Sequence, residues 1–403
     1  GAGPINGPIQ AAVFGWVPVL LWIIIGGIFF GAVQDFGSLF ASIRHKGKSL
    51  GEIIEVNISH RTKICFTVFA WLVLILVVAA FADIVAGTFA GFDADGQQVP
   101  ANGSVATASM LFIPLAVAFG LFNRKSSHLA INTIVGVALL IACIAIGMNC
   151  PIYFSKTAWL IVVFIYIFIA SVAPVWILLQ PRDYLNSFLL YFMILAAIIG
   201  IIFTNPNMEL EAFTSWTSSI GPMFPFLFVT VACGAISGFH SLISSGTTSK
   251  QINSEGDAKM IGYGSMLIEC VLAVIALIAV GSASMDSWSG MNPPQVFAAG
   301  ISTMLGKIGF PEGTAHTVLL LAISAFALTS LDTATRLGRF LFQEMFATNK
   351  DGSPNVLSNM YVATAITIGA AALLTIAGYT KIWALFGACN QLVAVPAFLA
   401  VAC

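Results

Sequence analysis

The stretch Gly234-Ala235-Ile236-Ser237-Gly238-Phe239-His240 interrupts an apolar run, at about residues 222 to 245, that is long enough to cross a membrane. A similar stretch, Gly1-Ala2-Gly3-Pro4-Ile5-Asn6-Gly7-Pro8, precedes the first complete apolar run. Glycine and proline weaken helices, and irregular backbone at membrane depth is tolerated only where it lines a protected cavity. Broken helices in corresponding positions of two halves are typical of transporter binding sites. We therefore predict two discontinuous helices beside one substrate site; the alternative is that the glycines only let helices pack closely.

The composition excludes a water-soluble globular protein. Of the 403 residues, 59% are hydrophobic and only 8% are charged. Soluble domains carry roughly 25% charged residues. Sixteen basic and seventeen acidic residues leave a net charge of -1, so no basic surface is available for nucleic acid. The seven cysteines are scattered through apolar runs without paired spacing, which indicates buried thiols and not disulfides or metal ligands.

Apolar runs of about 20 residues, the length that a helix needs to cross a bilayer, recur along the whole chain. None of them alternates as a barrel strand does, so the sequence predicts an all-α, polytopic membrane protein. Basic residues fall in every second connection, which places those connections in the cytoplasm. The eleven predicted spans cover about residues 17 to 41, 64 to 90, 105 to 123, 128 to 148, 155 to 180, 184 to 203, 222 to 245, 258 to 281, 315 to 340, 356 to 378 and 382 to 403.

The order of these segments predicts a single transmembrane transport domain, residues 1 to 403, built from two inverted halves. Short helical segments, Ser49–Glu55 and Pro294–Ile301, follow the second span of each half and are expected on opposite sides of the membrane. With the halves aligned in this way, the first half covers residues 1 to 148 and lacks its N-terminal part. An inserted helix pair lies within 149 to 221, and the second half covers 222 to 403.

Ionisable residues inside apolar runs are costly unless they are neutral, paired or hydrated, and they therefore indicate ion or proton pathways. For Asp35 a structural role near the helix end is an equal interpretation, and Asp83 is also explained by an outer vestibule. Asp332 shares a helix face with Arg336, which forms either an internal ion pair or a cytoplasmic anchor. The candidates for ion or proton coupling are Asp35, Asp83, His240, Glu269 and Asp332.

Polar residues near the second interruption add further candidates. His240 precedes a run rich in serine and threonine, where it either senses protons and contacts substrate or has a structural role. Asn390 and Gln391, in the last span, either hydrogen-bond a ligand or hold two helices together. The sequence contains no His-Glu-x-x-His, Walker or Gly-x-Ser-x-Gly motif. We therefore expect no enzyme, and an intramembrane serine hydrolase built on Ser237 is the remaining enzymatic interpretation.

Several sequence blocks, spread from one end of the chain to the other, are specific in combination: Gly1–Pro8, Gly31–Phe36 with Ser42–Arg44 and Gly47–Ser49, Val231–His240 with Ser245–Thr248, Thr329–Arg336, and Phe386–Gln391. Together they resemble the carbon starvation protein A family. The resemblance implies a member of the amino acid, polyamine and organocation superfamily, with the leucine-transporter type of five-plus-five inverted repeat. It also implies a multi-pass protein of the bacterial or archaeal inner membrane that takes up peptides, or pyruvate, during carbon starvation. Family members carry a further N-terminal stretch and a longer C-terminus, which we expect outside this sequence.

The resemblance also implies which residues meet the substrate and the coupling ion. The discontinuous first helix of each half would flank the substrate, and Thr329 with Ser330 match the position of a sodium site in proteins of this fold. The coupling ion is Na⁺ or H⁺, with the proton favoured because His240, Asp332 and Glu269 can carry one; no other cofactor is expected. The expected substrate-binding residues are Gly1, Ala2, Gly3, Pro4, Gly234, Ala235, Ser237, Gly238, His240, Asn390 and Gln391.

These expectations combine into a secondary active importer, proton- or sodium-coupled, that works by alternating access. Peptides are the first expected substrate, and a pyruvate/proton symporter is the alternative. A membrane sensor that binds the same nutrient without moving it is the competing interpretation. The expected partners are a small-molecule substrate and membrane lipid, without nucleic acid, and no particular oligomeric state is predicted.

Overall fold

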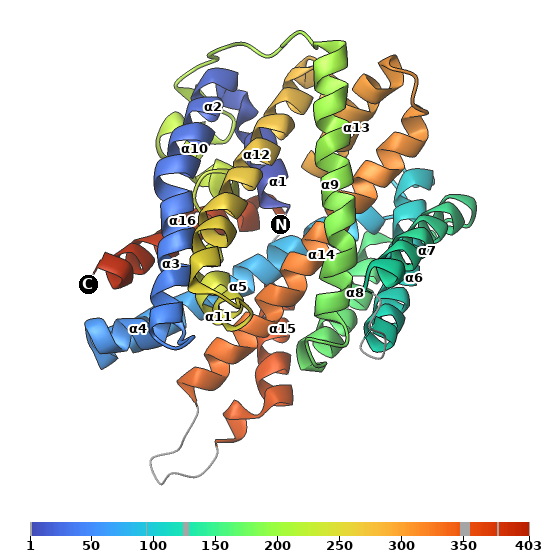
Figure 1. Cartoon of the computed structure of the whole chain (residues 1–403). Helices are drawn as coiled ribbons and strands as arrows, with labels where there is room; N and C mark the ends of the chain where they lie inside the picture. Colours follow the sequence, from blue (N-terminus) through green and yellow to red (C-terminus); the bar gives the residue numbers. More distant parts are fainter. Residues whose placement is uncertain (1, 94, 124–128, 347–354, 377–378, 403) are drawn as a thin grey trace. The chain divides into compact units, whose positions relative to one another are not determined.

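The structure is a computed structural model that describes residues 2–93, 95–123, 129–346, 355–376 and 379–402. These residues form helices joined by turns (Figure 1). Between residues 204 and 223, β1 (Thr217–Ser218) and β2 (Gly221–Pro222) pair as one small antiparallel hairpin. Among the described residues, eight helices are long and apolar enough to cross a membrane, and three shorter apolar helices lie where the other predicted spans were expected. The prediction of an all-α polytopic membrane protein is confirmed at this level.

The helices follow one another along the chain with the following bounds. The first part contains α1 (Gly3–Ala11), α2 (Trp16–Ile25), α3 (Ala32–Arg44), α4 (Leu50–Asn57) and α5 (His60–Phe89). The middle part contains α6 (Pro100–Asn123), α7 (Leu129–Asn149), α8 (Lys156–Val172) and α9 (Leu179–Thr204). After the hairpin come α10 (Met223–Val231), α11 (Gly238–Gly246), α12 (Ser265–Gly281), α13 (Pro293–Lys307), α14 (Glu312–Met345), α15 (Met360–Thr375) and α16 (Tyr379–Ala402).

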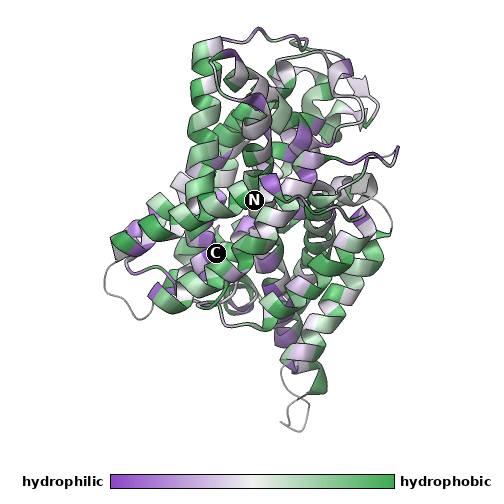
Figure 2. Ribbon diagram, turned by 90° about the vertical axis from the view of Figure 1, so that its right-hand side faces the viewer, coloured by the Kyte–Doolittle hydropathy of each residue, from purple (hydrophilic) through white to green (hydrophobic). Residues whose placement is uncertain are grey.

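Large hydrophobic side chains remain exposed along many of these helices. Ile134 of α7 is 70% exposed and Phe203 of α9 is 74% exposed. Figure 2 shows hydrophobic residues along the lengths of the helices and hydrophilic residues concentrated in several of the connections. Soluble monomers rarely expose large contiguous apolar patches, whereas the hydrocarbon core of a bilayer accepts them. The distribution therefore fits helices that face lipid.

The chain divides into two compact units, and each draws on distant parts of the sequence. The first unit contains Gly1–Ala2, Phe81–Asn207 and Trp288–Asp332, and so includes α6 to α9 and α13. The second unit contains Gly3–Ala80, Met208–Ser287 and Thr333–Cys403, and so includes α1 to α4, α10 to α12, α15 and α16. Each unit thus combines segments from both predicted halves, and the inverted relation between those halves stays a prediction.

The two short helical segments expected after the second spans are present. Helix α4 begins after Ser49, whose hydroxyl accepts a hydrogen bond from the backbone N–H of Glu52 at 3.3 Å. Helix α13 begins after Asn292, which forms a reciprocal capping box with Gln295. Such caps satisfy backbone donors that a helix start leaves unpaired. The local sequence therefore accounts for where both helices begin.

The first predicted interruption is helical where the structure describes it. Helix α1 runs from Gly3 to Ala11 with Pro8 inside it, and Gly1 lies outside the described residues. The prediction of irregular backbone is therefore wrong from Gly3 to Pro8. A Cβ atom on Gly7 would lie 2.3 Å from the carbonyl oxygen of Val231, and one on Gly3 would lie 2.6 Å from Cβ of Cys233. In α1, then, the glycines allow close packing, which was the alternative interpretation.

We expect Gly7→Ala to destabilise the second unit, because the added methyl group would meet backbone and not a movable side chain. Overpacking of this kind typically costs about 1–3 kcal/mol. Thermal unfolding in detergent measures the effect as a lower midpoint temperature. Gly313→Ala in α14 is the matched control, since a Cβ there would meet no atom within 4 Å among the described residues. Equal midpoints for the two variants would contradict the packing argument.

The second interruption breaks a helix, as predicted. Helix α10 ends at Val231, a 3-10 turn covers Ala232–Gly234, and α11 begins only at Gly238. At Ala232 the backbone has a φ of 41°, which an L-residue other than glycine rarely adopts. The regular hydrogen-bond ladder therefore stops between the two half-helices.

Two π-helical segments accompany the break. Gly26–Gly31 joins α2 to α3, and Met260–Gly264 leads into α12. A Cβ atom on Gly31 would lie 2.3 Å from the carbonyl oxygen of Ala235, so this segment packs directly against the irregular backbone. Single π-helical turns are rare in proteins, and those that occur often lie at functional sites. They occur here in the two membrane helices that carry Asp35 and Glu269.

Candidate functional site

Two neighbouring amide side chains of α16 bind the two halves of the broken helix. Asn390 Oδ1 accepts a 2.7 Å hydrogen bond from the backbone N–H of Phe239, in the first turn of α11. Gln391 Nε2 donates a 2.6 Å hydrogen bond to the carbonyl oxygen of Phe228 in α10. Backbone groups at helix ends need such partners, above all in a bilayer. Of the two roles that the sequence left open for these amides, holding helices together is the one with hydrogen bonds in the structure.

Side chains from α3 and α16 also meet at Ser237, inside the break. Asn390 Nδ2 donates to the Ser237 hydroxyl at 3.1 Å. Gln34 of α3 donates through Nε2 to the carbonyl oxygen of Ser237 at 2.8 Å and to the hydroxyl of Ser241. Next to it, a Cβ atom on Gly238 would lie 2.2 Å from the carbonyl oxygen of Asn390, so the contact requires glycine. The broken conformation is therefore specified by its surroundings.

His240, in the first turn of α11, lies between two carboxylates. Its Nδ1 is 2.9 Å from Oδ2 of Asp35 in α3, and its Nε2 is 3.4 Å from Oε2 of Glu269 in α12. All three residues belong to the second unit, and Asp35 is only 5% exposed. Three of the five ionisable residues predicted for coupling thus form one cluster beside the break.

The number of protons on this cluster determines its hydrogen bonds. A protonated imidazole carries a positive charge that attracts both carboxylates, with a hydrogen bond to Asp35 and an ionic contact of 3.4 Å to Glu269, whereas the neutral ring lacks that charge. Loss of a proton therefore weakens the attachment of α11 to α3 or to α12. Oδ1 of Asp35 and Oε1 of Gln34 are buried without a hydrogen-bond partner among the described residues. They are acceptors available to a ligand that carries donors.

A second cluster of charges is buried in the first unit. Arg182 of α9 pairs with Oδ2 of Asp332 in α14, and the two side chains are 1% and 0% exposed. Tyr166 of α8 donates a 2.8 Å hydrogen bond to the same carboxylate oxygen. The guanidinium that the structure places on Asp332 is therefore that of Arg182, from the predicted inserted helix pair.

Hydrogen bonds extend this cluster along α9. Nη2 of Arg182 is 3.1 Å from Oδ1 of Asp183, and the Thr329 hydroxyl donates to the same oxygen at 3.2 Å. Asn186 Nδ2 in turn donates to Thr329 at 3.1 Å. Ser330 instead donates to a carbonyl of its own helix at 3.0 Å. The two hydroxyls expected to bind sodium thus have different partners, and the sodium site stays a prediction.

Asp83 is separate from both clusters in its interactions. Lys156 Nζ lies 2.8 Å from Oδ1 of Asp83, and both residues belong to the first unit. The lysine side chain is 46% exposed and that of Asp83 is 12% exposed. This ion pair balances the carboxylate, whose role in proton coupling stays a prediction.

The remaining predicted substrate residues lie within α1 or the break. Gly3 and Pro4 are buried at the start of α1, Ala2 is buried directly before it, and Gly1 lies outside the described residues. Gly234 and Ala235 are buried in the irregular segment itself, where a Cβ atom on Gly234 would lie 3.2 Å from Cβ of Ala273. These positions are tightly packed, so their role toward a substrate stays a prediction.

A cavity of about 430 Å³ lies along α11 in the second unit. Volumes of this size accommodate small organic molecules. Its wall includes Leu242, Ser245 and Gly246 of α11, and charged side chains of both signs: Glu52, Glu344 and Lys250.

Comparison with known proteins identifies the family. The family described as "Carbon starvation protein CstA" matches residues 1–297 and 288–403, which together cover the chain. The chain belongs to the CstA family. It is therefore a multi-pass membrane protein of a bacterial transporter family and not an enzyme.

The CstA-family relatives differ in what their names state. The chain is 31% identical to the peptide transporter CstA of Bacillus subtilis, over 98% of this chain and 72% of that protein. It is 33% identical to the pyruvate/proton symporter BtsT of Escherichia coli, over 92% of this chain and 52% of that protein. It is 32% identical to the peptide transporter CstA of Campylobacter jejuni, over 99% and 66%. The chain thus spans about half the length of the Escherichia coli relative.

Among solved structures, the CstA-family chain is similar to a manganese transporter of Eremococcus coleocola. The TM-score is 0.32 and the sequence identity 13%, over 99% of this chain and 77% of that chain. A likeness at this level assigns neither a fold nor a cargo.

Members of the two CstA clusters that were not predicted from the sequence include Arg182, Tyr166 and Gln34. Arg182 stands at the start of an apolar run, where an arginine is usually a cytoplasmic anchor. Gln34 directly precedes Asp35 in a block that carries the family resemblance, so its position was a usable signal. Tyr166 lies in a run of aliphatic and aromatic residues, and nothing in its neighbourhood distinguishes it.

We expect Asn390→Leu to destabilise this CstA-family protein, because the Phe239 N–H and the Ser237 hydroxyl both lose a buried partner. Leaving a buried donor unpaired costs about 1–3 kcal/mol. The midpoint of thermal unfolding in detergent should fall accordingly. Asn149→Leu is the control, because that exposed amide donates, among the described residues, to the carbonyl oxygen of Ala145 in its own helix. A fall of equal size in both variants would argue against the bridging role of Asn390.

Proposed function

We propose that this chain is a secondary active importer of small organic nutrients, peptides first, driven by a proton gradient. The observation that carries the proposal is the position of His240 between Asp35 and Glu269, in the first turn of half-helix α11. Membership of the CstA family supports transport, and the cluster supports the proton as the coupling ion.

Proton coupling follows from the cluster because it joins half-helix α11 to α3 and α12. Each proton bound or lost changes the charges of His240, Asp35 and Glu269, and therefore the attraction that joins α11 to α3 and α12. An extracellular proton that enters the cluster would favour the attached position of α11, and its release inside would favour the detached one. Substrate transport then requires that the substrate site be formed by the same half-helix, and the cavity along α11 borders it at Leu242, Ser245 and Gly246.

The cavity along α11 favours peptides over pyruvate. A peptide carries an ammonium group and a carboxylate, and Glu52 with Glu344 and Lys250 offer charges opposite to each. Pyruvate carries a carboxylate alone and so offers no positive charge to the acidic side chains, of which Glu344 already lies 3.5 Å from Nζ of Lys63. A pyruvate/proton symporter remains the second candidate, because one of the relatives bears that name.

The proposed architecture is a five-plus-five inverted repeat. The same order occurs twice in the second unit: α1 followed by the π-helical segment between α2 and α3, then α10 and α11 followed by the π-helical segment before α12. In this arrangement the broken helix and α1 would be the first helices of the two halves. Thr329 and Ser330 remain the proposed position for Na⁺ if sodium contributes.

Uptake into proteoliposomes tests the proposal. The purified protein is reconstituted, and a labelled dipeptide and labelled pyruvate are offered with an imposed proton gradient, an imposed sodium gradient, or none. We expect dipeptide accumulation with acid outside and little response to sodium. Signal for both substrates that is independent of every gradient would refute the proposal.

Counterflow separates a transporter from a sensor. Vesicles loaded with unlabelled dipeptide are diluted into labelled dipeptide without any gradient. A transporter exchanges label into the vesicles, whereas a protein that binds the nutrient without moving it leaves only stoichiometric binding.

A further inference from the structure

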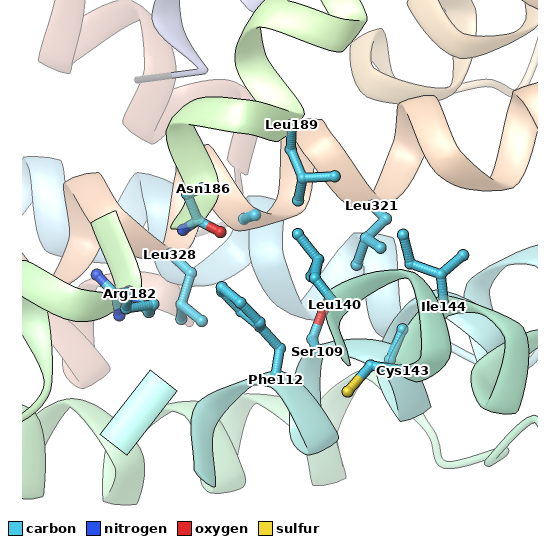
Figure 3. Close-up of a pocket in the computed structure, with 12 residues that line it drawn as sticks. Ser109, Phe112, Leu140, Cys143, Ile144, Arg182, Asn186, Leu189, Leu321 and Leu328 are labelled. Atoms are coloured by element: carbon cyan, nitrogen blue, oxygen red, sulfur yellow. The ribbon is translucent and has the colours of Figure 1, made fainter. Parts of the chain in front are cut away.

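A small enclosed cavity lies among four helices of the first unit. Its walls come from α6, α7, α9 and α14, with Leu140, Leu189 and Leu321 among the lining residues (Figure 3). The space open to the centre of a water molecule is about 10 Å³. One buried water needs roughly 10–15 Å³ by this measure. The cavity is therefore of the size of a single water molecule and too small for an organic ligand.

Three polar side chains line this cavity with an unused hydrogen-bonding atom. Oδ1 of Asn186, Oγ of Ser109 and Nε of Arg182 are buried and lack a hydrogen-bond partner within the described part of the chain. The three residues are 2%, 5% and 0% exposed. Figure 3 shows the amide oxygen of Asn186 on the side of Leu189, Leu321 and Ser109. An unpaired polar atom in such surroundings is costly, and three around one cavity require a common explanation.

We propose that this cavity binds one internal water molecule, which bridges Asn186 of α9 to Ser109 of α6. Asn186 Oδ1 offers an acceptor, Arg182 Nε a donor, and the Ser109 hydroxyl either function. Water has two donors and two acceptors, so it satisfies all three atoms at once. A buried water typically makes about three hydrogen bonds, the number available here.

The same inventory excludes an ion. A sodium ion requires several oxygen ligands, whereas Arg182 presents a donor and a positive charge. A chloride ion would be repelled by the acceptor Oδ1 of Asn186. Only a ligand that both donates and accepts fits the three side chains.

The water extends the hydrogen-bonded cluster around Asp332 to a further helix. Asn186 already donates to Thr329, which donates to Asp183, which in turn contacts Arg182. With the water, the chain of hydrogen bonds continues from Asn186 to Ser109. Asn186 and Ser109 thus act as positioning residues for the buried ion pair, independently of any substrate.

A high-resolution map of the protein in nanodiscs tests the site directly. We expect a density peak within hydrogen-bond distance of Asn186 Oδ1 and Ser109 Oγ, and its loss in Asn186→Leu. The absence of the peak in the unsubstituted protein, at a resolution that reveals other buried waters, would overturn the proposal.

Thermal stability gives a second test whose sign differs between a wet and a dry cavity. If water satisfies both groups, Ser109→Ala and Asn186→Leu each lower the unfolding midpoint, roughly by 1–4 °C, and the double variant loses less than the sum. If the cavity is dry, Ser109→Ala removes an unpaired polar atom and raises the midpoint, which would refute the proposal; Asn186→Leu also removes the hydrogen bond to Thr329, so the sign of the test rests on Ser109→Ala. Ser104→Ala, at a buried serine of α6 outside this lining, is the control.

The salt in the buffer distinguishes water from a cation. We expect equal midpoints in sodium chloride and choline chloride for the unsubstituted protein and for both variants. A stabilisation specific to sodium that disappears in Asn186→Leu would assign the site to an ion and overturn the proposal.

Discussion

Arg182→Leu should destabilise the first unit more than any other single substitution proposed for this protein. It leaves the carboxylate of Asp332, 0% exposed, without its guanidinium partner. Removing one member of a buried ion pair costs about 3–5 kcal/mol, because the remaining charge stays buried. Thermal or chemical unfolding in detergent measures this as a large loss of midpoint, and expression of folded protein in the membrane should fall with it.

The double variant Arg182→Leu with Asp332→Leu separates two causes of instability. One is the lost attraction between the two charges, and the other is the charge of Asp332 left buried without a partner. Replacing a whole buried pair by apolar residues is often neutral or stabilising, so the double variant should recover much of the loss. Lys156→Leu is the matched control, since it breaks an ion pair whose lysine is 46% exposed. Exposed pairs are worth about 0–1 kcal/mol. A double variant as unstable as the sum of the two single variants would refute the explanation by a buried charge without a partner.

His240→Gln should abolish the response of uptake to a proton gradient. A gradient of one pH unit stores about 1.4 kcal/mol, which supports about tenfold accumulation of substrate when one proton moves with each molecule. Glutamine keeps a hydrogen-bonding side chain but does not take up a proton in this range. Accumulation in proteoliposomes should therefore fall from about tenfold to about onefold at that gradient, while counterflow exchange continues.

A surface histidine is the control for this prediction. His60 Nδ1 lies 2.6 Å from a carboxylate oxygen of Glu55, so it shares the chemistry of the His240 cluster, but its side chain is 69% exposed. We expect His60→Gln to accumulate substrate like the unsubstituted protein. If His240→Gln accumulated substrate to the same ratio, the cluster would not carry the coupling proton.

The two glycine-rich stretches explain how far the sequence predicts the backbone. The same residue types indicate either a broken helix or a close helix contact, and the sequence does not distinguish them. At Gly238 the partner is the backbone of Asn390, and the helix is broken beside it. At Gly7 the partner is the backbone of Val231, and the helix continues. Which outcome occurs depends on residues far away in the sequence.

The candidate residues were easier to predict than their partners. Hydrophobic surroundings alone mark Asp35, His240, Glu269 and Asp332 as unusual, and all four have charged or ring partners in the structure. The Arg182–Asp332 pair joins residues 150 positions apart, whereas local spacing offered Arg336 as one of two interpretations. Periodicity relates residues within one helix, whereas this pairing depends on how α9 and α14 pack.

The adjacent amides of Asn390 and Gln391 have a mechanical consequence. Asn390 is hydrogen-bonded to α11 and Gln391 to α10. Both halves of the broken helix are therefore attached to the same turn of α16. Any swing of α11 must either carry α16 along or rupture a bond worth about 0.5–1.5 kcal/mol. We therefore expect α16 to restrict the movement of α11.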